Sequence, residues 1–146
     1  MLLGACLSLS AQGVNALEVN AHGPVSVQRG KAFQVPVKLN IRSGFHINTN
    51  DPGDKYLIPL QVSWESKLVE VGKTEFAEGK KMNFPFSEKP VAVYEGSTSL
   101  VQHFTVKPDA ARGFSAVTGT LKYQACNDRE CYPPATARVR VAIDVR

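Results

Sequence analysis

The stretch Phe33-Gln-Val-Pro-Val-Lys-Leu-Asn-Ile41 decides the fold class of this 146-residue chain. Its apolar residues alternate one by one with polar residues and Pro36, which is the pattern of a β-strand with one buried face. Because proline cannot donate a ladder hydrogen bond, Pro36 predicts that this strand lies at a sheet edge or carries a bulge.

Similar short patterns precede and follow this stretch. Turn residues separate them, as in Asn50-Asp-Pro-Gly53 and Arg112-Gly113, and no window sustains a helical period with caps at both ends. The sequence therefore favours an all-β fold, an immunoglobulin-like antiparallel β-sandwich. The further predicted strands are Leu17–Ala21, Val25–Gln28, Gly44–Asn48, Ile58–Trp64, Lys67–Val71, Ser99–Val106, Val117–Gln124 and Ala137–Val145.

Composition limits the classes of function. With 43% hydrophobic and 21% charged residues the chain is long and apolar enough for one globular core, which excludes a disordered or collagen-like protein. The 17 basic residues are dispersed among 13 acidic ones, so a nucleic-acid-binding stripe is not expected. No Ser-His-Asp array, carboxylate pair or glycine-rich phosphate loop can be assembled.

The first residues are apolar and small, unlike the rest of the chain. Residues 1–13 resemble the tail of a secretory signal, and their apolar run is too short to span a bilayer. Leu3-Gly4-Ala5-Cys6 also resembles a bacterial lipobox, which makes Cys6 a lipidation candidate. Both interpretations predict export to an oxidising compartment, with a leader in residues 1–13 and a single domain in residues 14–146.

Two cysteines remain for the folded domain, in the segment Tyr123-Gln-Ala-Cys-Asn-Asp-Arg-Glu-Cys-Tyr-Pro-Pro134. If residues 127–130 form a hairpin loop, Cys126 and Cys131 lie opposite one another, close to the reach of a disulfide. Counting the alternation forward from the core positions of the preceding strand places Cys126 on the polar face. We therefore expect its sulfur to be accessible from outside.

The spacing leaves two interpretations of this pair open. Closing a loop of about six residues stabilises a fold by roughly 2 kcal/mol, against about 4.7 kcal/mol for a hundred residues, so this bond is a weak staple. A weak staple suits a redox switch, yet exported domains also carry local hairpin disulfides. The chain is thus either a dithiol redox protein or a non-catalytic immunoglobulin-like interaction module. Neighbouring charges do not decide, because Arg129 favours a thiolate while Asp128 and Glu130 oppose it.

The run from Leu121 to Pro134 resembles the active-site segment of the N-terminal periplasmic domain of bacterial thiol:disulfide interchange proteins, the DsbD family. Gly44-Phe-His-Ile-Asn-Thr-Asn50 and Tyr56-Leu-Ile-Pro59 resemble the same domain. The resemblance implies a periplasmic immunoglobulin-like domain that accepts electrons from a thioredoxin-like domain, which a membrane-embedded electron carrier serves. Its acceptors would be periplasmic disulfide isomerases and the thioredoxins of cytochrome c maturation, which makes the chain part of a protein-disulfide reductase relay.

The resemblance also implies roles for single residues. In the family the second cysteine forms the mixed disulfide with partners, so Cys131 takes that role and Cys126 resolves the mixed disulfide. An aromatic cap loop shields the pair in the family. The irregular stretch Lys80–Pro90 is where this chain would supply such a loop, with Phe84 and Phe86 as capping rings and Tyr94 behind them.

Other side chains have both a functional and an ordinary interpretation. His46 aligns with an aromatic position near the active site, so it either assists proton transfer to a leaving thiolate or is a polar strand residue. Tyr132 precedes two prolines that stiffen the chain beside Cys131, and Tyr123 is expected in the core. A metal site built from the two cysteines and a histidine is a third alternative, but no ligand spacing supports it, and we expect no cofactor or metal.

Overall fold

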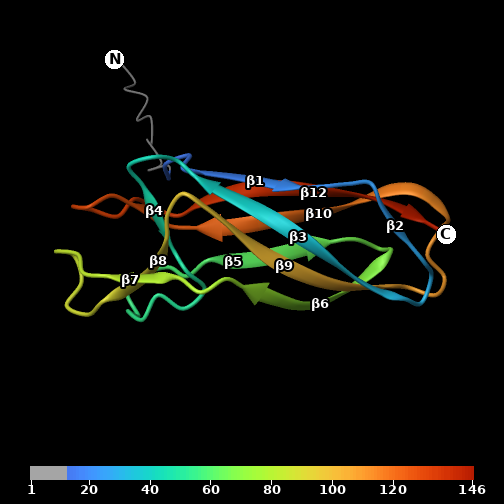
Figure 1. The fold of residues 1–146 in the computed structure, drawn as a ribbon, viewed down its shortest axis with the longest axis horizontal. Coiled ribbons are helices and arrows are strands. Elements are labelled where there is room, and N and C mark those ends of the chain that lie inside the picture. Colours follow the sequence, from blue (N-terminus) through green and yellow to red (C-terminus); the bar gives the residue numbers. More distant parts are fainter. Residues whose placement is uncertain (1–12) are drawn as a thin grey trace, which may run out of the picture.

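The computed structural model describes residues 13–146, which form twelve β-strands and no helix (Figure 1). The prediction of an all-β, immunoglobulin-like sandwich is confirmed. The strands are β1 (Leu17–Ala21), β2 (Val25–Val27), β3 (Ala32–Ile41), β4 (His46–Asn48), β5 (Gln61–Glu65), β6 (Val69–Phe76), β7 (Lys80–Met82), β8 (Val91–Tyr94), β9 (Ser97–Val106), β10 (Gly113–Tyr123), β11 (Ala125–Cys126) and β12 (Ala135–Val145).

Two four-stranded sheets, β1-β3-β9-β6 and β2-β12-β10-β5, enclose one hydrophobic core. All paired strands run antiparallel except β2 and β12, which are parallel. The core follows from the alternation in the sequence, since every second residue of β3, β10 and β12 is buried along most of each strand. Phe104 and Tyr123 are almost fully buried there, and Phe33 and Trp64 pack against the same core.

Pro36 does not mark a sheet edge. Strand β3 lies between β1 and β9, and its register with β9 passes through the Pro36–Val101 pair without a shift. The last β1 partner of β3 is Val37, so Pro36 lies just beyond the β1 ladder and has no neighbour from β1. Strand β3 is thus neither an edge strand nor bulged at Pro36, and the prediction is wrong. The proline is accommodated because the neighbouring strand β1 ends before it.

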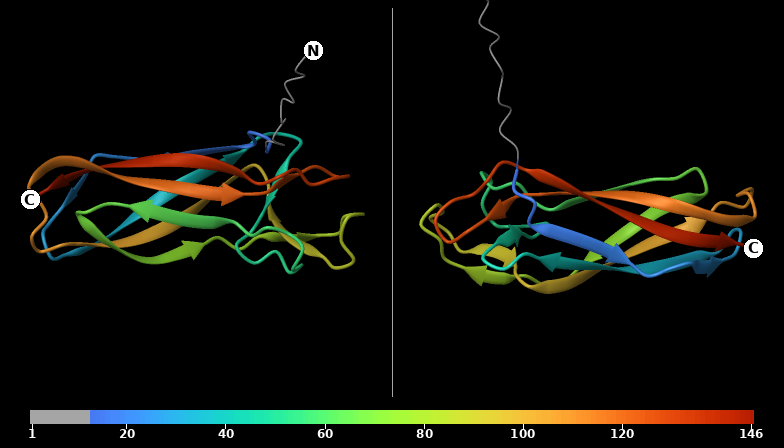
Figure 2. Two further views of the ribbon diagram at one scale, coloured as in Figure 1. Left: turned by 180° about the vertical axis from the view of Figure 1, so that it is seen from behind. Right: turned by 90° about the horizontal axis from the view of Figure 1, so that it is seen from above.

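A third sheet, β11-β4-β8-β7, occupies one end of the sandwich. The chain leaves β10 at Tyr123 and pairs with β4 from Ala125 onward, so it passes from a main sheet to the small one within two residues. Figure 2 shows that the loop after β11 and the loop after β7 project from this end, opposite the C-terminus. The small sheet therefore gathers the cysteine segment and the irregular stretch of the sequence.

The irregular stretch before Val91 contains β7, and β8 follows directly, although neither strand was predicted. Strand β7 has three residues, exposes Lys80 and Lys81, and forms the edge of the small sheet, where exposed lysines are common. Residues 1–12, including the lipidation candidate Cys6, lie outside the described part of the chain. Within residues 13–146, no helix is long and apolar enough to cross a membrane.

Candidate functional site around the hairpin disulfide

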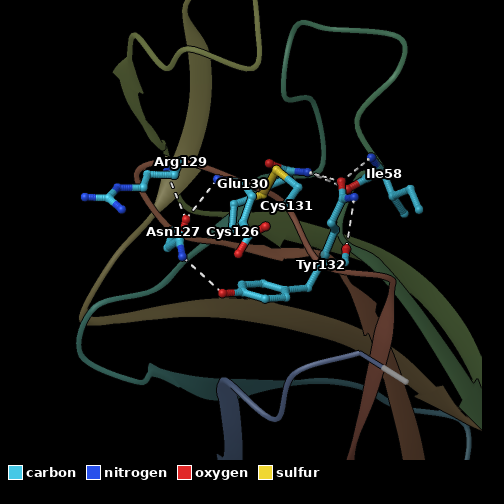
Figure 3. The surroundings of a disulfide bond; sticks show 9 residues. Ile58, Cys126, Asn127, Arg129, Glu130, Cys131 and Tyr132 are labelled. Atoms are coloured by element: carbon cyan, nitrogen blue, oxygen red, sulfur yellow. Dashed lines mark hydrogen bonds between the residues drawn. A yellow bond between two sulfur atoms is a disulfide. The ribbon is translucent and has the colours of Figure 1, made fainter. Parts of the chain in front are cut away.

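Cys126 and Cys131 form a disulfide whose Cα atoms are 4.0 Å apart (Figure 3). The two residues pair as an isolated antiparallel bridge, and the N–H of Asn127 donates to the carbonyl of Glu130 at 2.9 Å. The predicted hairpin around residues 127–130 is therefore present.

The side chain of Asn127 organises this hairpin. Its Oδ1 accepts the N–H groups of Arg129 and Glu130, each at 2.9 Å, and its Nδ2 donates to the hydroxyl of Tyr132 at 3.0 Å (Figure 3). Asparagine commonly closes a turn in this way. The hairpin is thus held by its own hydrogen bonds, so a disulfide adds little to its stability.

The two cysteines differ in burial. Cys126 is 0% exposed, whereas Cys131 is partly exposed. The prediction of an outward-facing Cys126 is wrong, because the alternation of β10 does not continue through the change of sheet at Gln124, and Ala125 and Cys126 are both buried. The partly exposed member of the pair is Cys131.

Gln124 connects the cysteine hairpin to the rest of this end of the domain. Its Oε1 accepts hydrogen bonds from Asn48 Nδ2 and from the N–H of Ile58, each at 3.0 Å. Its Nε2 donates to the carbonyl of Tyr132 at 3.2 Å, directly after Cys131. The sequence reasoning missed this role, although a glutamine two residues before the first cysteine was part of the motif that carried the family resemblance.

His46 lies opposite Cys126 in the β4–β11 ladder and is 4% exposed. Its ring stacks on Phe84, with ring centroids 4.3 Å apart and planes inclined by 19°. Burial lowers the pKa of His46 below 6.5, and the nearby carboxylates of Glu95 and Asp128 oppose this shift only in part. The imidazole is therefore mainly neutral at neutral pH.

The two rings expected to form a cap stack on each other. Phe84 and Phe86 are nearly parallel, with centroids 5.0 Å apart and planes inclined by 7°. Phe84 is buried against Val91 and Val93 of β8, and Phe86 is partly buried beside it. The structure thus brings both rings next to His46, which in turn is the cross-strand neighbour of Cys126.

The three tyrosines of the predicted site have different surroundings. Tyr94 is buried in β8 and donates its hydroxyl hydrogen bond to the carbonyl of Ala77, and burial raises the pKa of this phenol. Tyr132 follows Cys131, and its ring centroid lies 5.9 Å from that of Phe45. Tyr123 belongs to the main core, where its hydroxyl donates to the carbonyl of Val14 at 3.0 Å.

Titratable groups in the described chain do not gather into a metal site: within residues 13–146 no three His, Cys, Asp or Glu side chains are placed to hold one ion. The fold and this site together define an all-β, immunoglobulin-like domain with a hairpin disulfide at one end.

The sequence matches the family described as thiol:disulfide interchange protein DsbD, N-terminal, over residues 14–143. The chain belongs to this family, whose chemistry is thiol–disulfide interchange. No curated protein sequence matches the chain.

The solved structures that resemble the chain include a DsbD domain and a ScsB domain. The N-terminal domain of DsbD from Neisseria meningitidis, in the reduced form, is 20% identical with a TM-score of 0.47, and the match covers 75% of this chain and 77% of that chain. The N-terminal periplasmic domain of ScsB from Proteus mirabilis is 11% identical with a TM-score of 0.57, covering 88% of this chain and 47% of that chain. The chain thus spans about half of the ScsB structure, with which it shares a fold.

Proposed function

We propose that residues 14–146 form a periplasmic thiol–disulfide exchange domain that relays electrons through Cys126 and Cys131. The observation that supports this role best is the unequal burial of the pair, because Cys126 is 0% exposed while Cys131 is partly exposed. A partner's sulfur can therefore approach Cys131 and is kept away from Cys126. Exchange with a partner thus takes place at one defined sulfur of the pair, that of Cys131.

The exchange begins when the thiolate of reduced Cys131 attacks a disulfide of the oxidised partner. A mixed disulfide forms and one partner sulfur leaves as a thiolate. Cys126 then attacks the Cys131 sulfur, the Cys126–Cys131 bond forms, and the second partner sulfur leaves. Two electrons have passed to the partner. The hairpin favours the second step because it holds the two Cα atoms 4.0 Å apart in the oxidised state, which gives the attacking thiol a high effective concentration.

Family membership supports an inference about the partners. We infer that electrons come from a thioredoxin-like domain served by a membrane electron carrier, and that periplasmic disulfide isomerases or cytochrome c maturation thioredoxins accept them. The periplasmic setting is supported by the ScsB domain, which is described as periplasmic. A signal-type leader in residues 1–13, with lipidation at Cys6 as its alternative, is consistent with export.

We further propose that Phe84 and Phe86 cap the site in the oxidised domain. Their loop is tied to a neighbouring loop, since the Ser87 hydroxyl donates to Asp54 Oδ2 at 2.6 Å. The Ser87 and Tyr56 hydrogen bonds hold the pKa of Asp54 below its usual value of 3.8, so the carboxylate stays charged at neutral pH. The cap loop is therefore held in place by a contact that a docking partner can displace.

Trapping of a mixed disulfide tests the proposed function. A Cys126→Ser variant keeps the exchanging sulfur and lacks the resolving one, so it should accumulate a covalent complex with an oxidised thioredoxin-like protein. The matched Cys131→Ser variant should form none, because its remaining sulfur is buried. Titration of the wild-type pair against glutathione should be reversible. A pair that stays oxidised below about −300 mV, in a protein whose partner binding survives loss of both cysteines, would instead identify a non-catalytic interaction module.

A further inference from the structure

The burial of Cys126 creates a requirement for proton transfer. In each turnover its sulfur must change between thiol, thiolate and disulfide. A thiolate that forms at a residue with 0% exposure loses its hydration, and this loss disfavours the charged, reactive form of the sulfur. A group beside Cys126 that takes up and returns the proton would remove this obstacle.

His46 is placed to be that group. It is the direct antiparallel partner of Cys126, so the two side chains lie on the same face of the small sheet with Cβ atoms about 4.5 to 5.5 Å apart. The imidazole is 4% exposed, and its Nε2 has no hydrogen-bond partner among residues 13–146. A buried polar atom without a partner is costly to the folded state, and this nitrogen is free to exchange a proton with a neighbouring group.

A cavity connects His46 with charged groups at the surface. It has a volume of about 200 Å³, and its lining includes the buried imidazole and two exposed carboxylates. These carboxylates come from the turn after β8 and from the cysteine hairpin, and they are the charged groups that face the ring; the stacked rings of Phe84 and Phe86 are uncharged. The residues lining the cavity are Gly44, Phe45, His46, Met82, Glu95 and Asp128.

We propose that His46 exchanges the proton of Cys126 during formation and opening of the disulfide, an inference that rests on the proposed function. In resolution, the imidazole removes the thiol proton as Cys126 Sγ attacks Cys131 Sγ. The intramolecular disulfide forms, the bond from Cys131 to the partner breaks, and the partner sulfur leaves with the electron pair. In the opposite direction a donor thiolate attacks Cys131, Cys126 leaves as a thiolate, and the imidazolium returns the proton.

The surroundings of the ring suit both directions. Burial lowers the pKa of His46 and so keeps the imidazole neutral at neutral pH, with a nitrogen able to accept the proton of Cys126. Glu95 and Asp128 raise the pKa of His46 against the effect of burial, so they stabilise the imidazolium once it forms. The stack on Phe84 fixes the plane of the ring without using either of its nitrogen atoms.

A two-step release assay separates resolution from the first attack. Reduced protein, in excess, is mixed with the aromatic disulfide dithionitrobenzoate; attack by Cys131 releases the first coloured thiolate and attack by Cys126 releases the second. His46→Phe preserves an aromatic ring for Phe84 and removes the base. At neutral pH the second release should slow by about tenfold or more while the first stays within about twofold, and the difference should shrink as rising pH deprotonates the thiol directly. His22→Phe, which removes an exposed histidine, is the matched control.

His46→Ala provides a second test in case the bulkier variant does not fold. Added imidazole should restore its second release, whereas pyrrole, a ring of similar size without a basic nitrogen, should not. An unchanged second release and pH profile in His46→Phe, or equal rescue of His46→Ala by both rings, would overturn the role of His46 alone. A wild-type protein that releases no second thiolate would overturn the proposed function as well.

Discussion

Replacing Gln124 by alanine should loosen the end of the domain that carries the disulfide. The substitution removes one side chain and three hydrogen bonds, to Asn48 Nδ2, to the N–H of Ile58 and to the carbonyl of Tyr132. At about 0.5 to 1.5 kcal/mol for each partly buried bond, the free energy of unfolding should fall by about 2 to 4 kcal/mol. For a chain of this size the melting temperature should fall by roughly 5 to 15 °C.

Thermal unfolding of the oxidised protein, followed by circular dichroism, measures this loss. Gln28→Ala is the matched control, because that glutamine is exposed and should leave the melting temperature unchanged. Gln124→Glu should give an intermediate value, since it keeps an acceptor for Asn48 and Ile58 but places a second acceptor against the Tyr132 carbonyl. The reasoning is refuted if Gln124→Ala melts at the same temperature as Gln28→Ala.

Four further outcomes follow from the contacts around the site. Ser87→Ala removes the hydrogen bond to Asp54 and should speed reduction of the disulfide by glutathione at neutral pH. Equal rates in Ser87→Ala and the control Ser26→Ala would contradict a closed cap loop. Phe84→Ala should lower the free energy of unfolding by about 3 to 5 kcal/mol in urea titrations, because Phe84 is only 6% exposed. A loss no larger than that of a substitution at an exposed site would argue against the packing of Phe84. Replacing both Cys126 and Cys131 by alanine should lower the free energy of unfolding by only roughly 2 kcal/mol in the same titrations, because the closed loop is short and Asn127 holds the hairpin. A much larger loss would identify a structural disulfide. Since burial lowers the pKa of His46, the unfolded state binds more protons than the folded state just below pH 6.5. The free energy of unfolding of the wild type should therefore fall on acidification through that range, and His46→Phe should lose this part of the pH dependence. Identical pH profiles of the two proteins would refute this expectation.

Strict alternation in the sequence predicts those strands that have one buried face. Residues 33–41 alternate because one face of β3 contacts the core along most of its length, and β3 differs from the prediction by a single residue at its start. Strands β7, β8 and β11 were missed because they have two to four residues each, too few to show a period. Their pairing depends on neighbours distant in the chain, as for β11 with β4.

The candidate site was predicted in part. The cysteine hairpin follows from a short spacing and turn-forming residues, and these act within a few positions of each other. The outward placement of Cys126 failed at Gln124, where the chain changes sheets and the alternation count no longer applies. The aromatic stack on His46 leaves no signal in residue spacing, since His46 belongs to β4 whereas Phe84 lies in the loop after β7.

The sequence by itself determined the sandwich class, the position of the hairpin and membership of the DsbD N-terminal family, because alternation, turn chemistry and a short motif are written in neighbouring residues. Only the tertiary structure decided which cysteine is buried, which side chain lies across from it, and which glutamine holds the hairpin in place. Burial and hydrogen bonding at this end depend on contacts between segments such as β4 and β11. The folded chain alone brings those segments together, and its packing determines which sulfur a partner can reach.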